Sequence, residues 1–316
     1  MKKRFFSIIV TALLFCQSIF CTVYGAEIPD VGYQRISFEG KQYEYNSQIT
    51  AIMFAGIDSG DELTTYNRYS IAPRADTIDL LILDNYRKQM RLLAISRDTV
   101  TEIQRFAMNG VSRGYYDTQI GYAFSYGNGG KKSCENLADA VSSLLGGVPV
   151  HEYVVINNPT IAKANEMAGG ITVTVPNDDL IEMDERMKAG NAVTLDSSMA
   201  EMFVRYRDTE VPFSNNGRME RQKVYLKAYL EKMKEMVSEN PEQTWNEIES
   251  MKGSMITSIT KNQYLKLASL LKEENLSEED CYSLAGQDVQ GEVHDLFYPD
   301  EQQLQQMIVD LFYLEL

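Results

Sequence analysis

Long apolar runs separated by short polar stretches mark the first part of the chain after residue 48. The runs cover residues 49–57, 78–83 and 90–95. Near-continuous apolar runs of this length are typical of strands buried on both faces of a sheet. The connection between the second and third runs is short and polar, which predicts an antiparallel hairpin.

Helical spacing of apolar residues replaces these runs farther along. Helices are expected at 132–145, 158–167, 195–203 and 218–237, around Trp245, at 262–274, and after Asp300. Short strands at 153–156 and 171–175 flank the helix that begins at Asn158. A strand–helix–strand order of this kind predicts a parallel pair in one sheet.

Two stretches lack clear periodicity. Residues 26–47 are polar and aromatic-rich, and we expect this lead-in segment to be partly irregular. Residues 121–130 are rich in glycine and aromatics and precede a helix. They lack the lysine pattern of a phosphate-binding loop, so a flexible connection is the better interpretation.

The first residues carry an export pattern. Lys2, Lys3 and Arg4 precede a mostly apolar run, and residues 1–25 contain no acid. This segment is predicted to be a signal peptide, with an uncleaved membrane anchor as the alternative. Either reading places residues 48–316, a single body, outside the cytoplasm, secreted or anchored to the outer face of the cytoplasmic membrane.

Charge narrows the range of functions. The chain of 316 residues has a net charge of −15, and removing the three cations of the leader leaves −18. Such an acidic body excludes general nucleic-acid binding, which needs a basic face. His151 and His294 are the only histidines, so a histidine zinc site or a Ser-His-Asp triad is poorly supported. Cys134 and Cys281, the cysteines of the body, could form a disulfide or remain buried thiols.

Four arginines stand close together in this acidic chain. They are Arg205, Arg207, Arg218 and Arg221. Arg218 and Arg221 share a helix face with Gln222 and Tyr225, and Asn216-Gly217 is a turn signal before that helix. Guanidinium groups gathered at a helix N-terminus form a site for a polyanion such as phosphate. Solvated surface arginines are the alternative.

Charged residues also end the three buried strands. Asp58 follows the first strand, Arg74 and Asp76 precede the second, and Arg97 and Asp98 follow the third. Charged side chains at strand ends of a layered domain commonly line its cleft. Internal pairing of these arginines with these aspartates is the alternative, and it would leave no further role.

The motifs together, in order, resemble the LytR-CpsA-Psr family over residues 48 to 310. The matching residues are Asp58, Arg74-Ala75-Asp76-Thr77, Ser96-Arg97-Asp98, Gly169-Gly170-Ile171-Thr172-Val173, Arg205-Tyr206-Arg207, Gly217-Arg218-Met219-Glu220-Arg221-Gln222 and Tyr298-Pro299-Asp300.

The resemblance implies an α/β fold, an α-β-α layered domain with a mixed central sheet and a polyprenyl-lipid cleft. It implies a phosphotransferase that moves glycopolymers of the teichoic acid or capsule type from a polyprenyl-pyrophosphate carrier to peptidoglycan at the cytoplasmic membrane, with Mg²⁺ or Mn²⁺. Asp58 and Asp76 match the metal ligands. The expected pyrophosphate-binding residues are Arg74, Arg97, Arg205, Arg207, Arg218, Arg221 and Gln222, and the expected catalytic residues are Arg97, Asp98, Arg205, Arg207, Arg218 and Gln222.

Two positions depart from the family pattern. Gly60 stands where an arginine is common, and Asn215 where an aspartate is common. If that aspartate is the catalytic base, the protein should bind its donor but transfer slowly, unless Asp98, Asp208 or Glu210 substitutes. A non-catalytic extracytoplasmic protein that binds polyprenyl pyrophosphate is therefore the alternative. A third hypothesis is a transcriptional attenuator, a label that this family has often carried. The export pattern and the acidic body argue against it.

Overall fold

A computed structural model describes residues 34–273, 276–277, 279–292 and 294–316. The predicted signal peptide or anchor, residues 1–25, lies outside the described residues. Among the helices in the described ranges, none is long and apolar enough to span a bilayer.

A six-stranded mixed sheet forms the centre of the fold, with strand order β11-β8-β3-β4-β5-β12. Its strands are β3 (Ile49–Ile57), β4 (Ala75–Asp84), β5 (Gln89–Ala94), β8 (Glu152–Asn157), β11 (Met255–Thr257) and β12 (Cys281–Ser283). The three apolar runs form β3, β4 and β5, whose side chains are nearly all buried. The predicted antiparallel β4–β5 hairpin is confirmed, and β8 lies parallel to β3.

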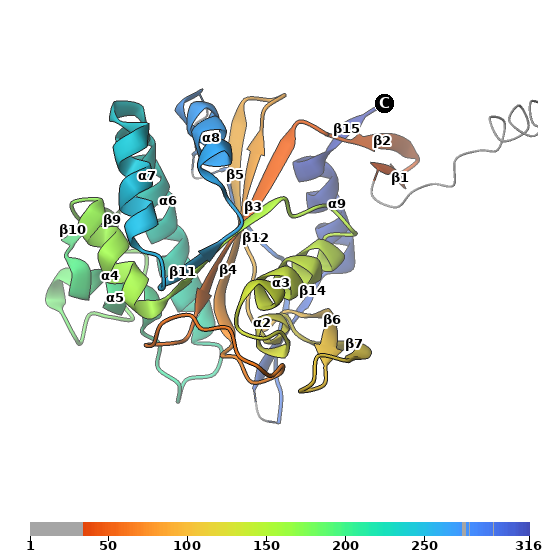
Figure 1. Cartoon of the computed structure of the whole chain (residues 1–316), viewed down its shortest axis with the longest axis horizontal. Helices are drawn as coiled ribbons and strands as arrows, with labels where there is room; N and C mark the ends of the chain where they lie inside the picture. The colour runs from red at the N-terminus through yellow and green to blue at the C-terminus, as the bar shows by residue number, and fades with distance from the viewer. Residues whose placement is uncertain (1–33, 274–275, 278, 293) are drawn as a thin grey trace, which may run out of the picture.

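Helices cover both faces of this sheet (Figure 1). The helices are α2 (Tyr122–Tyr126), α3 (Lys131–Leu144), α4 (Asn158–Met167), α5 (Ser197–Arg205), α6 (Asn215–Glu239), α7 (Pro241–Ser250), α8 (Lys261–Glu273) and α9 (Glu301–Phe312). One face packs against α2, α3 and α9 in the largest hydrophobic core. Leu230 of α6 and Leu267 of α8 pack on the other face, against Ile52 and Leu81. The α-β-α layering is therefore confirmed.

The predicted parallel pairing of the strands around α4 is wrong. β8 joins the central sheet, whereas β9 (Ile171–Thr174) pairs antiparallel with β10 (Ala192–Leu195) in a separate sheet. These two strands share a second core with α5 and the middle of α6. Gly169 and Gly170, both with positive φ, turn the chain away from α4 toward this second sheet.

The segments without periodicity are more ordered than expected. In the lead-in, β1 (Arg35–Phe38) and β2 (Lys41–Tyr45) form a hairpin that β15 (Tyr313–Glu315) extends. The glycine-rich stretch contains α2, and Gly130 packs against Thr65. Cys134 and Cys281 do not form a disulfide, and burial raises the pKa of Cys134 to about 12.

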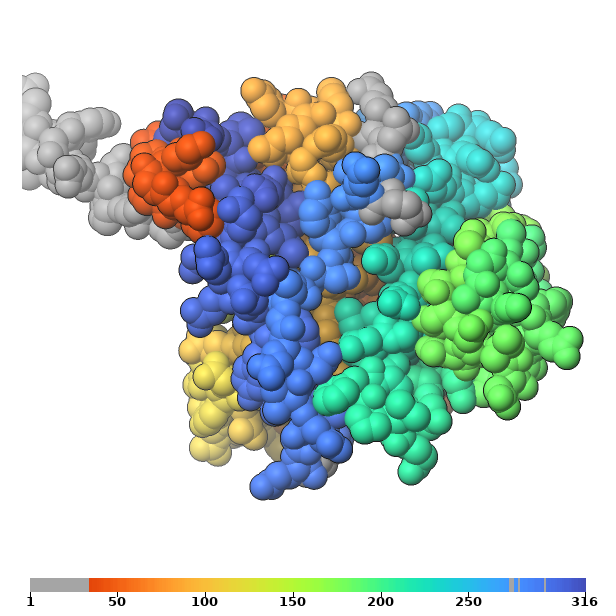
Figure 2. All heavy atoms as spheres, turned by 180° about the vertical axis from the view of Figure 1, so that it is seen from behind, coloured from red at the N-terminus to blue at the C-terminus, as the bar shows by residue number. Residues whose placement is uncertain are grey.

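Two further hairpins border the charged end of the sheet. They are β6 (Val100–Phe106) with β7 (Ser112–Gln119), and β13 (Gly286–Gln290) with β14 (Asp295–Pro299). The backbone N–H of Phe297 donates to the carbonyl of Asp98 at 2.9 Å, which ties the second hairpin to the end of β5. Seen from behind, the C-terminal segments lie between the β6–β7 hairpin and the start of α6 (Figure 2).

Candidate functional site

Three strand ends meet at one edge of the central sheet. Because β3 and β5 both run antiparallel to β4, the start of β4 lies beside their ends. The backbone N–H of Asp58 donates to the carbonyl of Arg74 at 3.3 Å. The register of β3 and β4 shifts between Gly56 and Ile57, which leaves Asp76 unpaired in the ladder. Topology thus brings together charged residues that are up to forty positions apart in the chain.

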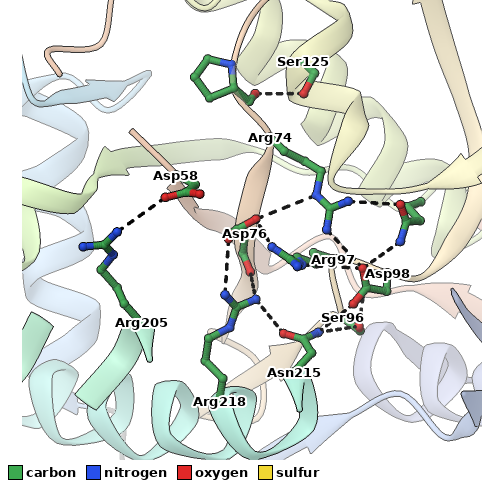
Figure 3. Close-up of polar contacts among 12 residues, drawn as sticks. Asp58, Arg74, Asp76, Ser96, Arg97, Asp98, Ser125, Arg205, Asn215 and Arg218 are labelled. Atoms are coloured by element: carbon green, nitrogen blue, oxygen red, sulfur yellow. Dashed lines mark hydrogen bonds and ion pairs between the residues drawn. The ribbon is translucent and has the colours of Figure 1, made fainter. Parts of the chain in front are cut away.

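Asp76 is surrounded by guanidinium groups (Figure 3). Its carboxylate pairs closely with Arg97, with Arg218 at 3.3 Å and with Arg74 at 3.9 Å. Burial alone would raise the pKa of Asp76, but the three arginines outweigh it and hold the pKa below its usual value. Asp76 is therefore ionised at neutral pH and fixes these three guanidinium groups.

Asp98 anchors the other side of the cluster and is 5% exposed. Its Oδ1 accepts from Arg74 at 3.2 Å and from Nε2 of Gln119 at 2.8 Å. Burial raises the pKa of Asp98, against the opposing effect of Arg97 and other arginines. The sequence did not single out Gln119, because its role depends on the fold bringing β7 beside β5.

Asn215 links the two halves of the cluster and is 3% exposed. Its amide Nδ2 donates to Asp98 Oδ2 at 3.1 Å and to Ser96 Oγ at 3.2 Å. Its Oδ1 accepts from Nη2 of Arg218 at 2.7 Å. Asn215 is thus a positioning residue that connects Asp98 to Arg218 without adding negative charge.

Arg207 is half-buried near the cluster but makes no hydrogen bond or ion pair with any described residue. Burial and the nearby charge of Arg97 lower its pKa, while Asp98 and Asp76 oppose that change. The Nε atoms of Arg97 and Arg218 are also buried, and neither has a hydrogen-bond partner in the described part of the chain. Arg97 Nε still lies 3.6 Å from Asp98 Oδ1, so the donors of half-buried Arg207 are the ones most open to a ligand.

The balance of charge in this cluster is positive. Arg74, Arg97, Arg207 and Arg218 face only two carboxylates, Asp76 and Asp98, which leaves a surplus of two positive charges. Internal pairing therefore neutralises only two of the four positive charges. In a chain with a net charge of −15, this surplus favours a bound anion with one negative charge on each of two phosphates.

Arg221, which the family resemblance predicts at the pyrophosphate, lies apart from this cluster. Its side chain is fully buried, and its donors go to the carbonyls of Phe203 and Tyr206, to Asn177 at 3.1 Å and to Asp179. All three guanidinium nitrogens donate inside the fold, and four of the five N–H groups have partners there. Arg221 instead fixes the chain that leads from α5 to Arg207.

The start of α6 also differs from the expectation. The helix begins at Asn215, so the predicted turn at Asn216-Gly217 lies inside its first turn. A Cβ atom at position 217 would lie 2.2 Å from Asp179 Oδ2, so glycine is needed for the close approach of that carboxylate. Gln222 likewise faces the helix junction, where its Nε2 donates to the carbonyl of Val204 at 2.9 Å.

Arg205 and Asp58 lie apart from the four-arginine cluster (Figure 3). Arg205 ends α5, half of its side chain is exposed, and it pairs with Glu201 and with Asp58 at 3.7 Å. Asp58 is the most exposed carboxylate of the site and also accepts from Nδ2 of Asn158 at 3.2 Å. A Cβ added at Gly60 would meet open space, so the lost arginine leaves this corner open.

The expected metal ligands are carboxylates, the donor type that Mg²⁺ and Mn²⁺ prefer. The described residues contain no group of three or more His, Cys, Asp or Glu side chains that could hold a metal ion. Mg²⁺ and Mn²⁺ need only one or two carboxylates when phosphate and water supply the other ligands. Asp58 and Asp76, at the adjoining ends of β3 and β4, fit that requirement.

Replacing Asn215 with aspartate is expected to weaken the binding of inorganic pyrophosphate at pH 8 by roughly tenfold. The new carboxylate would face Asp98 across the present 3.1 Å contact and remove half of the surplus positive charge. Two carboxylates so close share a proton at lower pH, so the loss should shrink toward pH 6. Calorimetric titration at both pH values measures this change.

The neighbouring substitution Asn216→Asp is the matched control, because Asn216 is exposed and contacts Asp288 rather than the cluster. Equal weakening in both variants would show that the contact with Asp98 is unimportant. A faster transfer reaction in Asn215→Asp would instead show that a carboxylate at this position acts as a base.

Comparisons with known proteins agree with the motif order. The LytR_cpsA_psr family model matches residues 30–312. The chain is 29% identical over 123 residues to the polyisoprenyl-teichoic acid–peptidoglycan teichoic acid transferase TagU of Halalkalibacterium halodurans, covering 39% of this chain and 34% of that protein. It is 26% identical over 216 residues to the TagU protein of Bacillus cereus, covering 68% of this chain and 60% of the relative.

Among solved structures, TagV of B. subtilis superposes with a TM-score of 0.63 at 24% identity, over 84% of this chain and 96% of that one. This likeness shows the fold, while the chain spans only about a third to three fifths of the length of the two curated relatives. The family model, by contrast, matches nearly all of the described residues. The chain therefore belongs to the LytR-CpsA-Psr family.

Proposed function

We propose that this protein is a phosphotransferase that moves a cell-wall glycopolymer from a polyprenyl-pyrophosphate carrier to peptidoglycan. The observation that carries the proposal is the surplus of two positive charges in the arginine cluster, with Arg207 unpaired among the described residues. A pyrophosphate diester has the matching charge and offers acceptors to several guanidinium groups. The names of the two curated relatives, both teichoic acid transferases, support the same substrate class.

In the proposed reaction a hydroxyl oxygen of the acceptor glycan attacks the phosphorus that carries the glycopolymer. The bond from that phosphorus to the bridging oxygen breaks, and the polyprenyl phosphate leaves with the electron pair. Arg74, Arg97, Arg207 and Arg218 stabilise the negative charge that grows on these oxygens. The hydroxyl proton goes to Asp98, which lies inside the cluster, has a raised pKa, and would release Arg74 or Asn215 to accept that proton.

Asp58 and Asp76 would hold a divalent cation, Mg²⁺ or Mn²⁺. When bound, the cation neutralises part of the charge on the phosphate oxygens. Asp76 would then serve both the cation and three guanidinium groups, while Asp58 keeps exposed oxygens for the cation. Arg205 competes for Asp58 and would be released when the cation binds.

The lipid tail would lie on the sheet face below α6. Phe54, Val154 and Leu226 are only partly buried there and pack against a buried cluster that includes Leu230. Partly exposed apolar side chains beside a charged site suit an amphiphilic ligand. An extracytoplasmic position at the membrane, as the leader predicts, would give the protein access to such a carrier.

A transfer assay with a lipid-pyrophosphate-linked glycopolymer and peptidoglycan tests the proposal. The expected result is product formation that needs a divalent cation and is abolished by a chelator, with activity restored by added Mg²⁺. Tight donor binding without turnover would instead support the non-catalytic binding protein. Failure of the protein to bind the donor at all would overturn both.

A further inference from the structure

A row of stacked arginines and tyrosines runs outward from Arg74. The Cζ atom of Arg74 lies 4.9 Å from the centre of the Tyr122 ring, and Tyr122 stacks on Tyr126 at 6.2 Å with an angle of 22° between the rings. The Cζ atom of Arg105 lies 5.0 Å from the Tyr126 ring and 4.9 Å from the Tyr116 ring. These five residues form one continuous row, the Arg–Tyr track.

The track leads from the site to the surface. Tyr122 and Tyr126, on α2, are half-buried, whereas Arg105 is exposed and Tyr116 is 46% exposed. The last two belong to the β6–β7 hairpin, which lies beside α2 and α3 at one end of the molecule (Figure 1). The register of this hairpin shifts between Gln104 and Phe106, so Arg105 occupies a bulge. Bulges commonly redirect a side chain. Here the side chain of Arg105 lies between the rings of Tyr116 and Tyr126.

Cations outnumber acids around the track. Residues 63–75, 103–116 and 118–134 contain no Asp or Glu, although the whole chain is strongly acidic. Their cations are Arg68, Arg74, Arg105, Arg113, Lys131 and Lys132. The first two segments are in contact, since Tyr69 packs on Phe106 at 5.4 Å. Lys132, from the third, lies 5.7 Å from the Phe106 ring. Three acids border these segments: Glu102 and Asp117 are register partners across the hairpin, and Glu135 pairs with Lys131 and Lys132 at 3.4 and 3.7 Å. The cations still outnumber these acids, so this end of the molecule attracts anions.

We propose that the Arg–Tyr track is a subsite for the anionic glycan of the donor, the sugar-phosphate units next to the pyrophosphate. Aromatic ring faces are partly negative and pack against the C–H faces of sugar rings, while guanidinium groups bind the phosphates between them. The track starts at Arg74, which also contacts Asp98 inside the arginine cluster. A chain that leaves the pyrophosphate along this path passes Arg74 and the half-buried Tyr122 and Tyr126, and then reaches Arg105 and the exposed ring of Tyr116. The inference rests on the proposed function.

Two soluble probes separate a phosphate-bearing glycan from a neutral one. The first is a short oligomer of N-acetylglucosamine 1-phosphate, and the second is the neutral N-acetylglucosamine tetramer. We expect the phosphate oligomer to bind more tightly. Arg105→Ala should weaken its binding by roughly tenfold, and Tyr116→Ala by several-fold. Tyr116→Phe, which keeps the ring, should bind nearly as the natural protein does.

Arg113→Ala is the matched control, because Arg113 is exposed on the same hairpin and has no aromatic contact within the described residues. Equal losses in Arg105→Ala and Arg113→Ala would reduce the effect to general charge and overturn the subsite. Equal binding of both probes, with equal sensitivity to Tyr116→Ala, would assign the track to a neutral acceptor glycan and would also overturn it.

Binding of inorganic pyrophosphate tests the proposed function separately from the subsite. The natural protein and Arg105→Ala should bind pyrophosphate equally, because Arg105 lies outside the arginine cluster. If the natural protein does not bind pyrophosphate, the proposed function fails. If it binds pyrophosphate but neither Arg105→Ala nor Tyr116→Ala alters binding of the phosphate oligomer, only the subsite fails.

Discussion

Replacing Arg207 with alanine is expected to lower glycopolymer transfer by roughly 10²–10³-fold and to leave the free energy of unfolding nearly unchanged. The two results belong together because Arg207 has no hydrogen bond or ion pair with any described residue. Its removal leaves no carboxylate without a partner, and it relieves repulsion with Arg97, which lowers the pKa of Arg207. Initial transfer rates and thermal unfolding of the same preparation measure both effects.

Two further variants are compared with Arg207→Ala. Arg113→Ala removes the same charge from an exposed position and should change the rate little. Arg218→Ala should lower both the rate and the stability, because Asp76 and Asn215 lose a partner. Full activity in Arg207→Ala would show that this guanidinium does not touch the substrate. A marked loss of stability would show that its role is structural.

Replacing Asp79 with asparagine is expected to stabilise the protein at pH 8 by up to roughly 4 kcal/mol, or roughly 5–10 °C in Tm, and by less than half as much at pH 5. Asp79 is 4% exposed, and its strand neighbours are Phe54 and Ala94. None of the described residues makes a hydrogen bond or ion pair with its carboxyl group. Burial therefore raises its pKa from 3.8 to about 7.

The direction of the pH dependence follows from that shift. A carboxyl group with a raised pKa favours the fold while it is protonated, so its contribution is complete below pH 4 and is lost as the pH rises through 7. The asparagine variant stays neutral throughout. Asp84→Asn is the contrasting variant, because Asp84 is fully buried but paired with Arg87 and Arg91, and its loss should destabilise the protein. A difference between Asp79→Asn and the natural protein that does not change with pH would contradict the account.

The sequence predicted those parts of the fold that depend on local pattern. The three apolar runs became β3, β4 and β5 because their side chains are buried on both faces, and no helical spacing competes there. Helix boundaries were close wherever a cap was present, as at Asp196 and Asp300, whose side chains accept backbone N–H groups. Pairing of distant strands was not predictable in the same way. Periodicity marks β9 as a strand but does not say that β10 would be its partner.

In the candidate site, too, the sequence predicted which residues gather but not which contacts they make. Motif order identified Arg74, Asp76, Arg97 and Arg218, and the fold brings all four together. Spacing along α6 also placed Arg221 on their side of the helix, but the burial of its guanidinium under α5 depends on tertiary packing. The role of Gln119 and the hydrogen bonds of Asn215 could not be predicted either, because their partners come from elements far away in the sequence. Residue type and spacing locate a charged site, while its division into ligand-binding and structural arginines needs coordinates.

The central claim is that the four-arginine cluster holds the pyrophosphate of the donor, and a crystal structure of the protein with a polyprenyl pyrophosphate tests it most directly. The account predicts that the phosphate oxygens lie within hydrogen-bond distance of Arg207 and of at least two of Arg74, Arg97 and Arg218, with Asp76 still at their centre. It also predicts that Arg221 keeps its bonds to Phe203 and Tyr206. A pyrophosphate bound elsewhere, with Arg207 still free of any phosphate contact at saturating ligand, would contradict the account.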